Sequence, residues 1–113
     1  VYERYHLPIL VTENGIGAPD ILEADGKIHD AYRIQFIREH LQQMRLAITD
    51  GVQILGYCPW AAIDVVSTHQ GYRKRYGFIY VDREEFDLKE LKRFRKDSFY
   101  WYANVILENG QNL

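Results

Sequence analysis

The chain has 113 residues, of which 47% are hydrophobic and 27% are charged, a balance typical of one small globular domain. Its formal net charge of −2 argues against a nucleic-acid partner, and no apolar run approaches the ~20 residues of a membrane-spanning helix. A single cysteine, Cys58, cannot form an internal disulfide, and the first residues lack the basic and apolar regions of a signal peptide, so we expect a cytoplasmic protein.

The first half of the sequence predicts a strand followed by a helix. Residues 8–12 form a short apolar run with branched side chains, which indicates a strand buried on both faces and ended by the turn of residues 13–15. Apolar side chains recur at three- and four-residue steps within residues 34–48, which is typical of one face of a helix. Asp30 is the expected N-cap of this helix, and Gly51 marks its end.

The second half predicts two more strands and a final helix. Residues 52–57 read as a second buried strand, and residues 78–81 as a short third strand that we expect beside the second. Residues 82–96 are predicted to be a charged connection. Asp97 and Ser98 each offer a cap for the last helix.

The order of elements is that of a βαβ unit, which predicts a parallel sheet. Two strand–helix pairs are too few to close a barrel of eight. By themselves they leave open sheet edges and uncovered apolar faces. We therefore expect the isolated chain to self-associate.

One carboxylate, that of Glu13, follows the first predicted strand directly. In parallel barrels, catalytic groups lie at the carboxyl ends of strands, where a carboxylate can attack an anomeric carbon. The plainer interpretation is a strand-end glutamate before an Asn-Gly turn. The same three letters recur at residues 108–110, where Gly110 is expected to end the last helix, so only Glu13 has the strand context.

The wider sequence resembles glycoside hydrolase family 1, whose Thr-Glu-Asn-Gly signature contains the nucleophile. Residues 12–15 carry that signature. Further segments that resemble the family, in order and with similar spacing, are residues 30–34, 56–64, 74–82 and 96–102. The resemblance covers nearly all of the chain. It implies an α/β fold, namely the C-terminal quarter (strands 7-8 and helices 7-8) of a (β/α)8 TIM barrel, with residues 1–113 as part of a single barrel domain whose N-terminal units are absent from this sequence.

Within the family, the loop after strand eight distinguishes two kinds of substrate. Ordinary β-glucosidases place Glu-Trp where this chain has Ser67 and Thr68, whereas 6-phospho enzymes have a serine, followed by a lysine and a tyrosine that match Lys74 and Tyr76. A glutamate would repel a phosphate dianion, while neutral hydroxyls donate hydrogen bonds and Lys74 adds a point charge. Without the resemblance, a solvated basic loop is the simpler interpretation.

Neighbouring residues refine this expectation. The basic cluster at residues 73–75 indicates a small anion as its target. Thr68 favours a gluco-configured sugar, because 6-phospho-β-galactosidases tend to have tryptophan there. Trp60 would form the platform of the glycone site, unless it is a core residue at a strand end.

The resemblance implies retaining hydrolysis of 6-phospho-β-glucosides to glucose 6-phosphate and an aglycone, with Glu13 as the nucleophile and Trp60, Ser67, Lys74 and Tyr76 as substrate-binding residues. A 6-phospho-β-galactosidase, an unphosphorylated β-glucosidase and a non-catalytic sugar-phosphate-binding barrel remain alternatives. The family's acid/base glutamate belongs to an Asn-Glu pair that this sequence lacks, so we expect the chain alone to be inactive.

Two further expectations concern the histidines and a run of charged side chains. The four histidines have no metal-ligand spacing, and neither a metal nor an organic cofactor is implied. A charge run near the end of the chain is interpreted as a solvated face; it consists of Lys89, Lys92, Arg93, Arg95 and Lys96.

Overall fold

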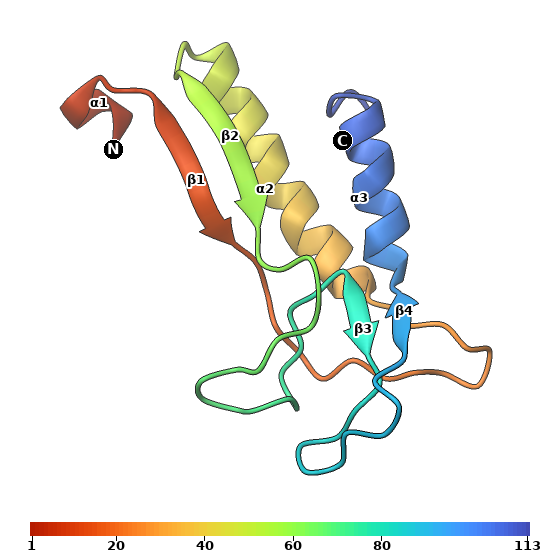
Figure 1. Ribbon diagram of the computed structural model, residues 1–113. Coiled ribbons are helices and arrows are strands. Elements are labelled where there is room, and N and C mark those ends of the chain that lie inside the picture. The colour runs from red at the N-terminus through yellow and green to blue at the C-terminus, as the bar shows by residue number, and fades with distance from the viewer.

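The computed structural model describes residues 1–113 as two small two-stranded sheets packed with two longer helices (Figure 1). The elements in chain order are α1 (Tyr2–Tyr5), β1 (Ile9–Asn14), α2 (Ala31–Thr49), β2 (Ile54–Pro59), β3 (Ile79–Val81), β4 (Arg93–Arg95) and α3 (Asp97–Leu107). The molecule is elongated, with extents of 49 × 29 × 17 Å. None of its helices combines the length and apolar character needed to span a membrane.

The predicted βαβ unit is confirmed. β1 and β2 pair in parallel, with Ile9 opposite Ile54 and Val11 opposite Tyr57, and α2 makes the crossover between them. A parallel pair needs such a crossover, because the chain must return to the same end before the second strand starts. The two strands therefore end side by side, at Asn14 and Pro59.

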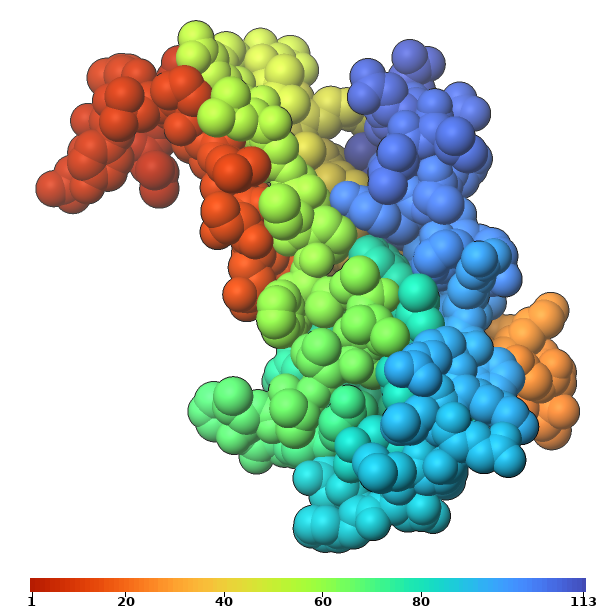
Figure 2. Space-filling model, viewed as in Figure 1, coloured from red at the N-terminus to blue at the C-terminus, as the bar shows by residue number.

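The prediction that both strands are buried on both faces is wrong for this chain. Leu10 is 50% exposed and Leu55 is 71% exposed. Figure 2 shows the red to orange N-terminal segment projecting from one side of the molecule, beside the yellow-green β2. The sheet has only two strands, so its apolar residues and its backbone edges are left uncovered.

The apolar core lies between α2 and α3. Ile37 and Leu41 of α2 pack with Phe78 and with Val105 of α3, and all four are buried. The ring of Phe78 stacks on Tyr102 with centroids 5.0 Å apart. The three- and four-residue periodicity thus identified the buried face of α2 at Ile37 and Leu41, but not at its end, where Ile48 is 49% exposed.

The third strand does not lie against β2 as expected. β3 pairs with β4 in an antiparallel ladder, and β4 falls within the segment predicted to be a connection. The contact between β3 and the chain after β2 is a single parallel bridge, Ile63 to Ile79. β2 ends at Pro59, and only the extension beyond it reaches β3.

The expected caps of α3 are also wrong. Its N-cap is Lys96, without a side-chain cap, and the N–H of Ser98 instead donates to Oδ1 of Asp30 (2.9 Å). The Ser98 hydroxyl donates to the other oxygen of Asp30 at 2.5 Å. Asp30 is at the N-cap position of α2 but caps α3, so it joins the starts of the two helices.

Lys96 belongs to a buried ionic network and not to a solvated face. Its side chain is fully buried, and Nζ lies 2.5 Å from Asp20 and 2.7 Å from Asp64. The network contains three carboxylates and three cations: Asp20, Asp30, Asp64, Arg33, Arg75 and Lys96. Burial, followed by the positive charge of Arg33, lowers the pKa of Lys96 against the opposing attraction of the carboxylates.

Candidate active site

Glu13 lies one residue before the end of β1, and its side chain is solvent-exposed. The N–H of Trp60 donates to the carbonyl of Asn14 at 2.7 Å, so the residues after both strands meet at one edge. The hydroxyl of Tyr57 donates to Oδ1 of Asn14 at 2.6 Å and fixes the side chain next to Glu13. Burial raises the pKa of Tyr57 to about 12, so this hydroxyl keeps its proton at neutral pH.

Trp60 is not a core residue in this structure, because it is 43% exposed. Its backbone lies directly against the loop that follows Glu13. A Cβ on Gly15 would be 1.9 Å from the carbonyl oxygen of Trp60, so only glycine fits there. The Trp60–Ala61 peptide bond is cis. Trp60 is therefore partly open to solvent, and its backbone lies at the strand edge that follows Glu13.

Ser67, Lys74 and Tyr76 come together in the structure. The Ser67 and Tyr76 hydroxyl oxygens are 3.5 Å apart, and Lys74 Nζ lies 5.3 Å from the centroid of the Tyr76 ring. Lys74 forms none of the ion pairs within the chain. Two hydroxyls and an unneutralised ammonium group therefore share one small region, which is suited to an anion.

The electrostatics of Tyr76 connect this group to Glu13. The hydrogen bond with Ser67, and after it the charge of Lys74, lowers the pKa of Tyr76 below its ordinary value, while burial opposes the shift. The negative charge of Glu13 opposes the shift as the smallest of these contributions. Direct contacts bring together three of the five expected site residues, namely Ser67, Lys74 and Tyr76.

The loop around Ser67 is closed by its own backbone. Ser67 and Gly71 exchange two hydrogen bonds of 2.9 and 3.0 Å. The hydroxyl oxygen of Ser67 accepts from the N–H groups of His69 (3.3 Å) and Gln70 (3.2 Å). Because its acceptor capacity is used within the loop, Ser67 can present its own O–H as a donor.

Arg75 lies between Lys74 and Tyr76 in the sequence, but its side chain does not join them in the candidate anion site. Its guanidinium is buried and bonds Asp64 (3.1 Å) and the carbonyls of Val81 (2.7 Å) and Arg83 (2.6 Å). Its backbone N–H and carbonyl pair with Ala18 at 2.9 and 3.1 Å. The expectation that residues 73–75 act together on an anion is therefore wrong, because Asp64 neutralises Arg75 inside the protein.

Asp64 fixes the segment that carries the expected ligands, and sequence patterns gave it no such role. Its carboxylate accepts from the N–H groups of Gly77 (2.9 Å) and Val81 (3.3 Å), as well as from Arg75 and Lys96. A Cβ on Gly77 would lie 2.2 Å from the backbone of Ile63. The only signal in the sequence was the family-like spacing between Asp64 and the later loop.

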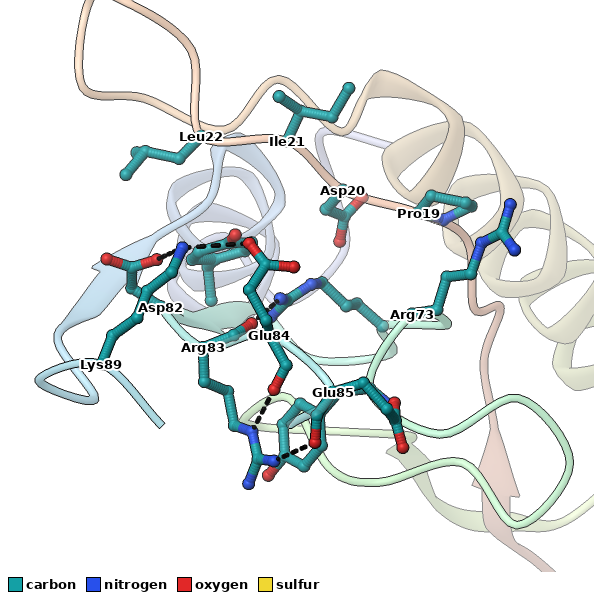
Figure 3. Close-up of a pocket in the computed structure, with 13 residues that line it drawn as sticks. Pro19, Asp20, Ile21, Leu22, Arg73, Asp82, Arg83, Glu84, Glu85 and Lys89 are labelled. Atoms are coloured by element: carbon teal, nitrogen blue, oxygen red, sulfur yellow. Dashed lines mark hydrogen bonds and ion pairs between the residues drawn. The ribbon is translucent and has the colours of Figure 1, made fainter. Parts of the chain in front are cut away.

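A separate hollow of about 670 Å³ lies between residues 19–22 and residues 82–85, and Arg73 and Arg75 also line it (Figure 3). In Figure 3, Lys89 bridges Asp82 and Glu84, and Arg83 bonds the backbone of Glu84 and Glu85. Side chains of both charges line it, and none of the five expected site residues does. Its mixed lining selects no particular ligand charge.

The chemistry available at the candidate site is that of one exposed carboxylate beside an anion-binding group. No cluster of three or more His, Cys, Asp or Glu side chains is arranged to hold a metal ion. A carboxylate of this kind can act as a nucleophile or as a base. Glu13 forms none of the ion pairs within the chain.

Comparison with known proteins places this chain in a family of glycosyl hydrolases. The sequence profile of glycosyl hydrolase family 1 matches residues 1–111. The aryl-phospho-beta-D-glucosidase BglC of Bacillus subtilis is 51% identical over 113 residues, which are 100% of this chain and 24% of that protein. The phospho-cellobiase of Klebsiella oxytoca is 50% identical over 114 residues, which cover 100% of this chain and 25% of that protein.

Solved structures give the same result for the fold. A family 1 b-glucosidase from Thermotoga maritima, in complex with isofagomine lactam, superimposes with a TM-score of 0.88 at 40% identity. The match covers 97% of this chain and 24% of that one. These neighbours are TIM-barrel enzymes, whereas this chain contains no closed barrel. The chain thus spans about a quarter of the length of the proteins that it matches.

Proposed function

The chain belongs to glycosyl hydrolase family 1, and from that premise we propose that it carries the nucleophile and the phosphate-binding loop of a retaining 6-phospho-β-glucosidase. The observation that carries the proposal is the grouping of Ser67, Lys74 and Tyr76, together with the position of Glu13 at the carboxyl end of β1. The names of the relatives agree with it, since BglC and the phospho-cellobiase are described as acting on phosphorylated glucosides.

The proposed reaction is a double displacement. A carboxylate oxygen of Glu13 forms a bond to the anomeric carbon as the bond to the aglycone oxygen breaks. A second carboxylic acid, from outside this chain and about 5–5.5 Å away from Glu13, protonates the departing oxygen. Water, deprotonated by that same group, then releases glucose 6-phosphate and frees Glu13.

Phosphate recognition is supported by the charge and the hydroxyl groups of this loop. A phosphate dianion near Tyr76 gains the positive charge of Lys74 and two hydroxyl donors, from Ser67 and Tyr76. Neutral Ser67 adds no repulsion, which a carboxylate at this position would. The exposed indole of Trp60 is available to pack on the sugar.

We further infer that these residues form the seventh and eighth strand–helix units of a barrel. The parallel pairing of β1 and β2 and the position of Glu13 at the carboxyl end of β1 support this placement. The remaining units would cover Leu10 and Leu55 and supply the acid/base group. A cytoplasmic location stays part of the proposal, because phosphorylated glycosides usually arise inside cells.

The test is a chimera in which this chain replaces the matching residues of BglC. We expect the chimera to hydrolyse nitrophenyl β-glucoside 6-phosphate with a kcat/KM at least about 100-fold above that for nitrophenyl β-glucoside. Lys74→Ala should lower kcat/KM about 10- to 100-fold for the phosphorylated substrate only, since a hydrogen bond to a charged group contributes about 1.5–3 kcal/mol. Lys92→Ala, which removes an exposed lysine paired with Glu90, is the matched control.

Each alternative predicts a different outcome of this test. Equal rates on both substrates would favour an unphosphorylated β-glucosidase, as the Thermotoga maritima structure is named. Preference for the galactoside 6-phosphate would favour the galacto enzyme. A chimera that binds glucose 6-phosphate without turnover, while BglC itself is active, would favour a non-catalytic sugar-phosphate-binding barrel.

A further inference from the structure

Gly17 packs closely against two of the expected phosphate ligands, Lys74 and Tyr76. A Cβ at this position would lie 2.6 Å from Cε1 of Tyr76 and 2.9 Å from Cγ of Lys74. Carbon atoms in favourable contact are about 3.5–4.0 Å apart, so any side chain here must displace both neighbours. The side chains of Lys74 and Tyr76 pack against the backbone at Gly17.

The backbone conformation at position 17 does not require a glycine. The glycines with positive φ are Gly26, Gly51, Gly71 and Gly110, so Gly17 has a backbone that alanine also adopts. The requirement for glycine at this position is therefore the space that a methyl group would take from Tyr76 and Lys74.

The backbone on both sides of this contact is held in place. Ala18, next to Gly17, exchanges two hydrogen bonds with Arg75, which stands between the two ligands. Nη2 of Arg33 donates to the carbonyl of Arg75 at 2.9 Å. The buried side chain of Arg75 bonds Asp64 and two backbone carbonyls. A methyl group at position 17 would consequently move side chains more readily than it would move backbone.

We propose that Gly17 is a positioning residue that sets the preference for a phosphorylated sugar, through its contact with Lys74 and Tyr76. The inference rests on the function proposed above. Gly17 follows the nucleophile by four positions, so one short loop holds Glu13 at one end and supports the phosphate ligands at the other. The loop thereby fixes the distance between the attacking carboxylate and the phosphate, and a rigid pyranose ring tolerates little change in that distance.

Gly17→Ala in the BglC chimera tests this inference. We expect kcat/KM for nitrophenyl β-glucoside 6-phosphate to fall about 10- to 100-fold, mostly through KM, as expected for weakened charge-assisted hydrogen bonds. The value for nitrophenyl β-glucoside should change less than about threefold. In a Tyr76→Ser background, where the ring is gone, Gly17→Ala should have a smaller further effect, because only the contact with Lys74 remains. Gly26→Ala is the control for general destabilisation: its methyl group would meet nothing within 4 Å, and although alanine is strained at its φ of 77°, kcat/KM for both substrates should stay unchanged.

The outcomes separate this inference from the proposed function. If Lys74→Ala acts only on the phosphorylated substrate and Gly17→Ala impairs both or neither, the role of Gly17 is refuted and the function stands. If Lys74→Ala is not selective, the function itself fails. Should Gly17→Ala prevent folding, restored folding in Gly17→Ala/Tyr76→Ser supports the steric contact, and continued misfolding overturns it.

Discussion

Replacing Lys96 with methionine is the most direct test of the buried ionic network. The substitution keeps an unbranched side chain but removes a charge that lies 2.5 Å from Asp20 and 2.7 Å from Asp64. Both carboxylates are almost fully buried and would lose a cation together. Removing one partner of a buried ion pair typically costs about 3–5 kcal/mol, because the remaining charge cannot return to water.

The structure places the expected cost of Lys96→Met at the lower end of that range. Asp20 keeps Arg33 at 2.9 Å, and Asp64 keeps Arg75 at 3.1 Å. Each carboxylate therefore retains one cation, and we expect a loss of about 3 kcal/mol. That free energy corresponds to a roughly 100-fold larger population of the opened state.

Native-state proteolysis of the chimera measures this population, because cleavage follows the opening equilibrium when reclosing is fast. Lys96→Met should accelerate cleavage about 100-fold at pH 7, whereas Lys92→Met, at an exposed pair with Glu90, should change it less than about fivefold. Equal cleavage rates for Lys96→Met and wild type would refute the argument.

The remaining predictions concern pH and assembly. Hydrogen bonds to Asp97, 2.6 Å from Nδ1, and then to Asp25 raise the pKa of His29 in the folded state. The contribution of His29 to stability is therefore full below its unfolded pKa, and it is lost as the pH rises through the higher folded pKa. His29→Ala should therefore lower the melting temperature at pH 5.5 and leave it unchanged at pH 9; equal shifts at the two pH values would contradict this. The isolated chain should sediment as oligomers through the open edges of β1 and β2 and should not hydrolyse nitrophenyl β-glucoside 6-phosphate, and an active or monodisperse cooperatively folded monomer would disprove it.

The βαβ unit could be predicted from the sequence alone. The branched apolar run before Glu13 and the helical periodicity that follows are local patterns, and α2 and the parallel pairing agree with both. Glu13 was predicted at the carboxyl end of the first strand, and β1 extends one residue beyond it. The family signature was likewise readable, because it consists of short segments at regular spacing.

The grouping of the candidate phosphate ligands was predicted only through the resemblance. The spacing of these residues alone did not predict that Ser67 contacts Tyr76. Nor did it predict that Arg75 is buried in an ion pair with Asp64 while Lys74 forms no ion pair. Neighbouring side chains of an extended segment point to opposite sides, so the bridge between Ala18 and Arg75 decides which side faces Asp64. The roles of these residues in binding remain predictions.

Tertiary structure alone decided which charged residues are buried. Lys96 was predicted to be part of a solvated run, yet its partner Asp20 is 76 positions away, and Asp30 caps α3 through Ser98, which is 68 positions later. A charge is stable inside a protein only where opposite charges and hydrogen-bond donors surround it, and such partners come from elements that are distant in sequence. Local patterns determine helices and strands because their hydrogen bonds and apolar faces repeat along the chain, whereas the pairing of buried charges depends on how those elements pack.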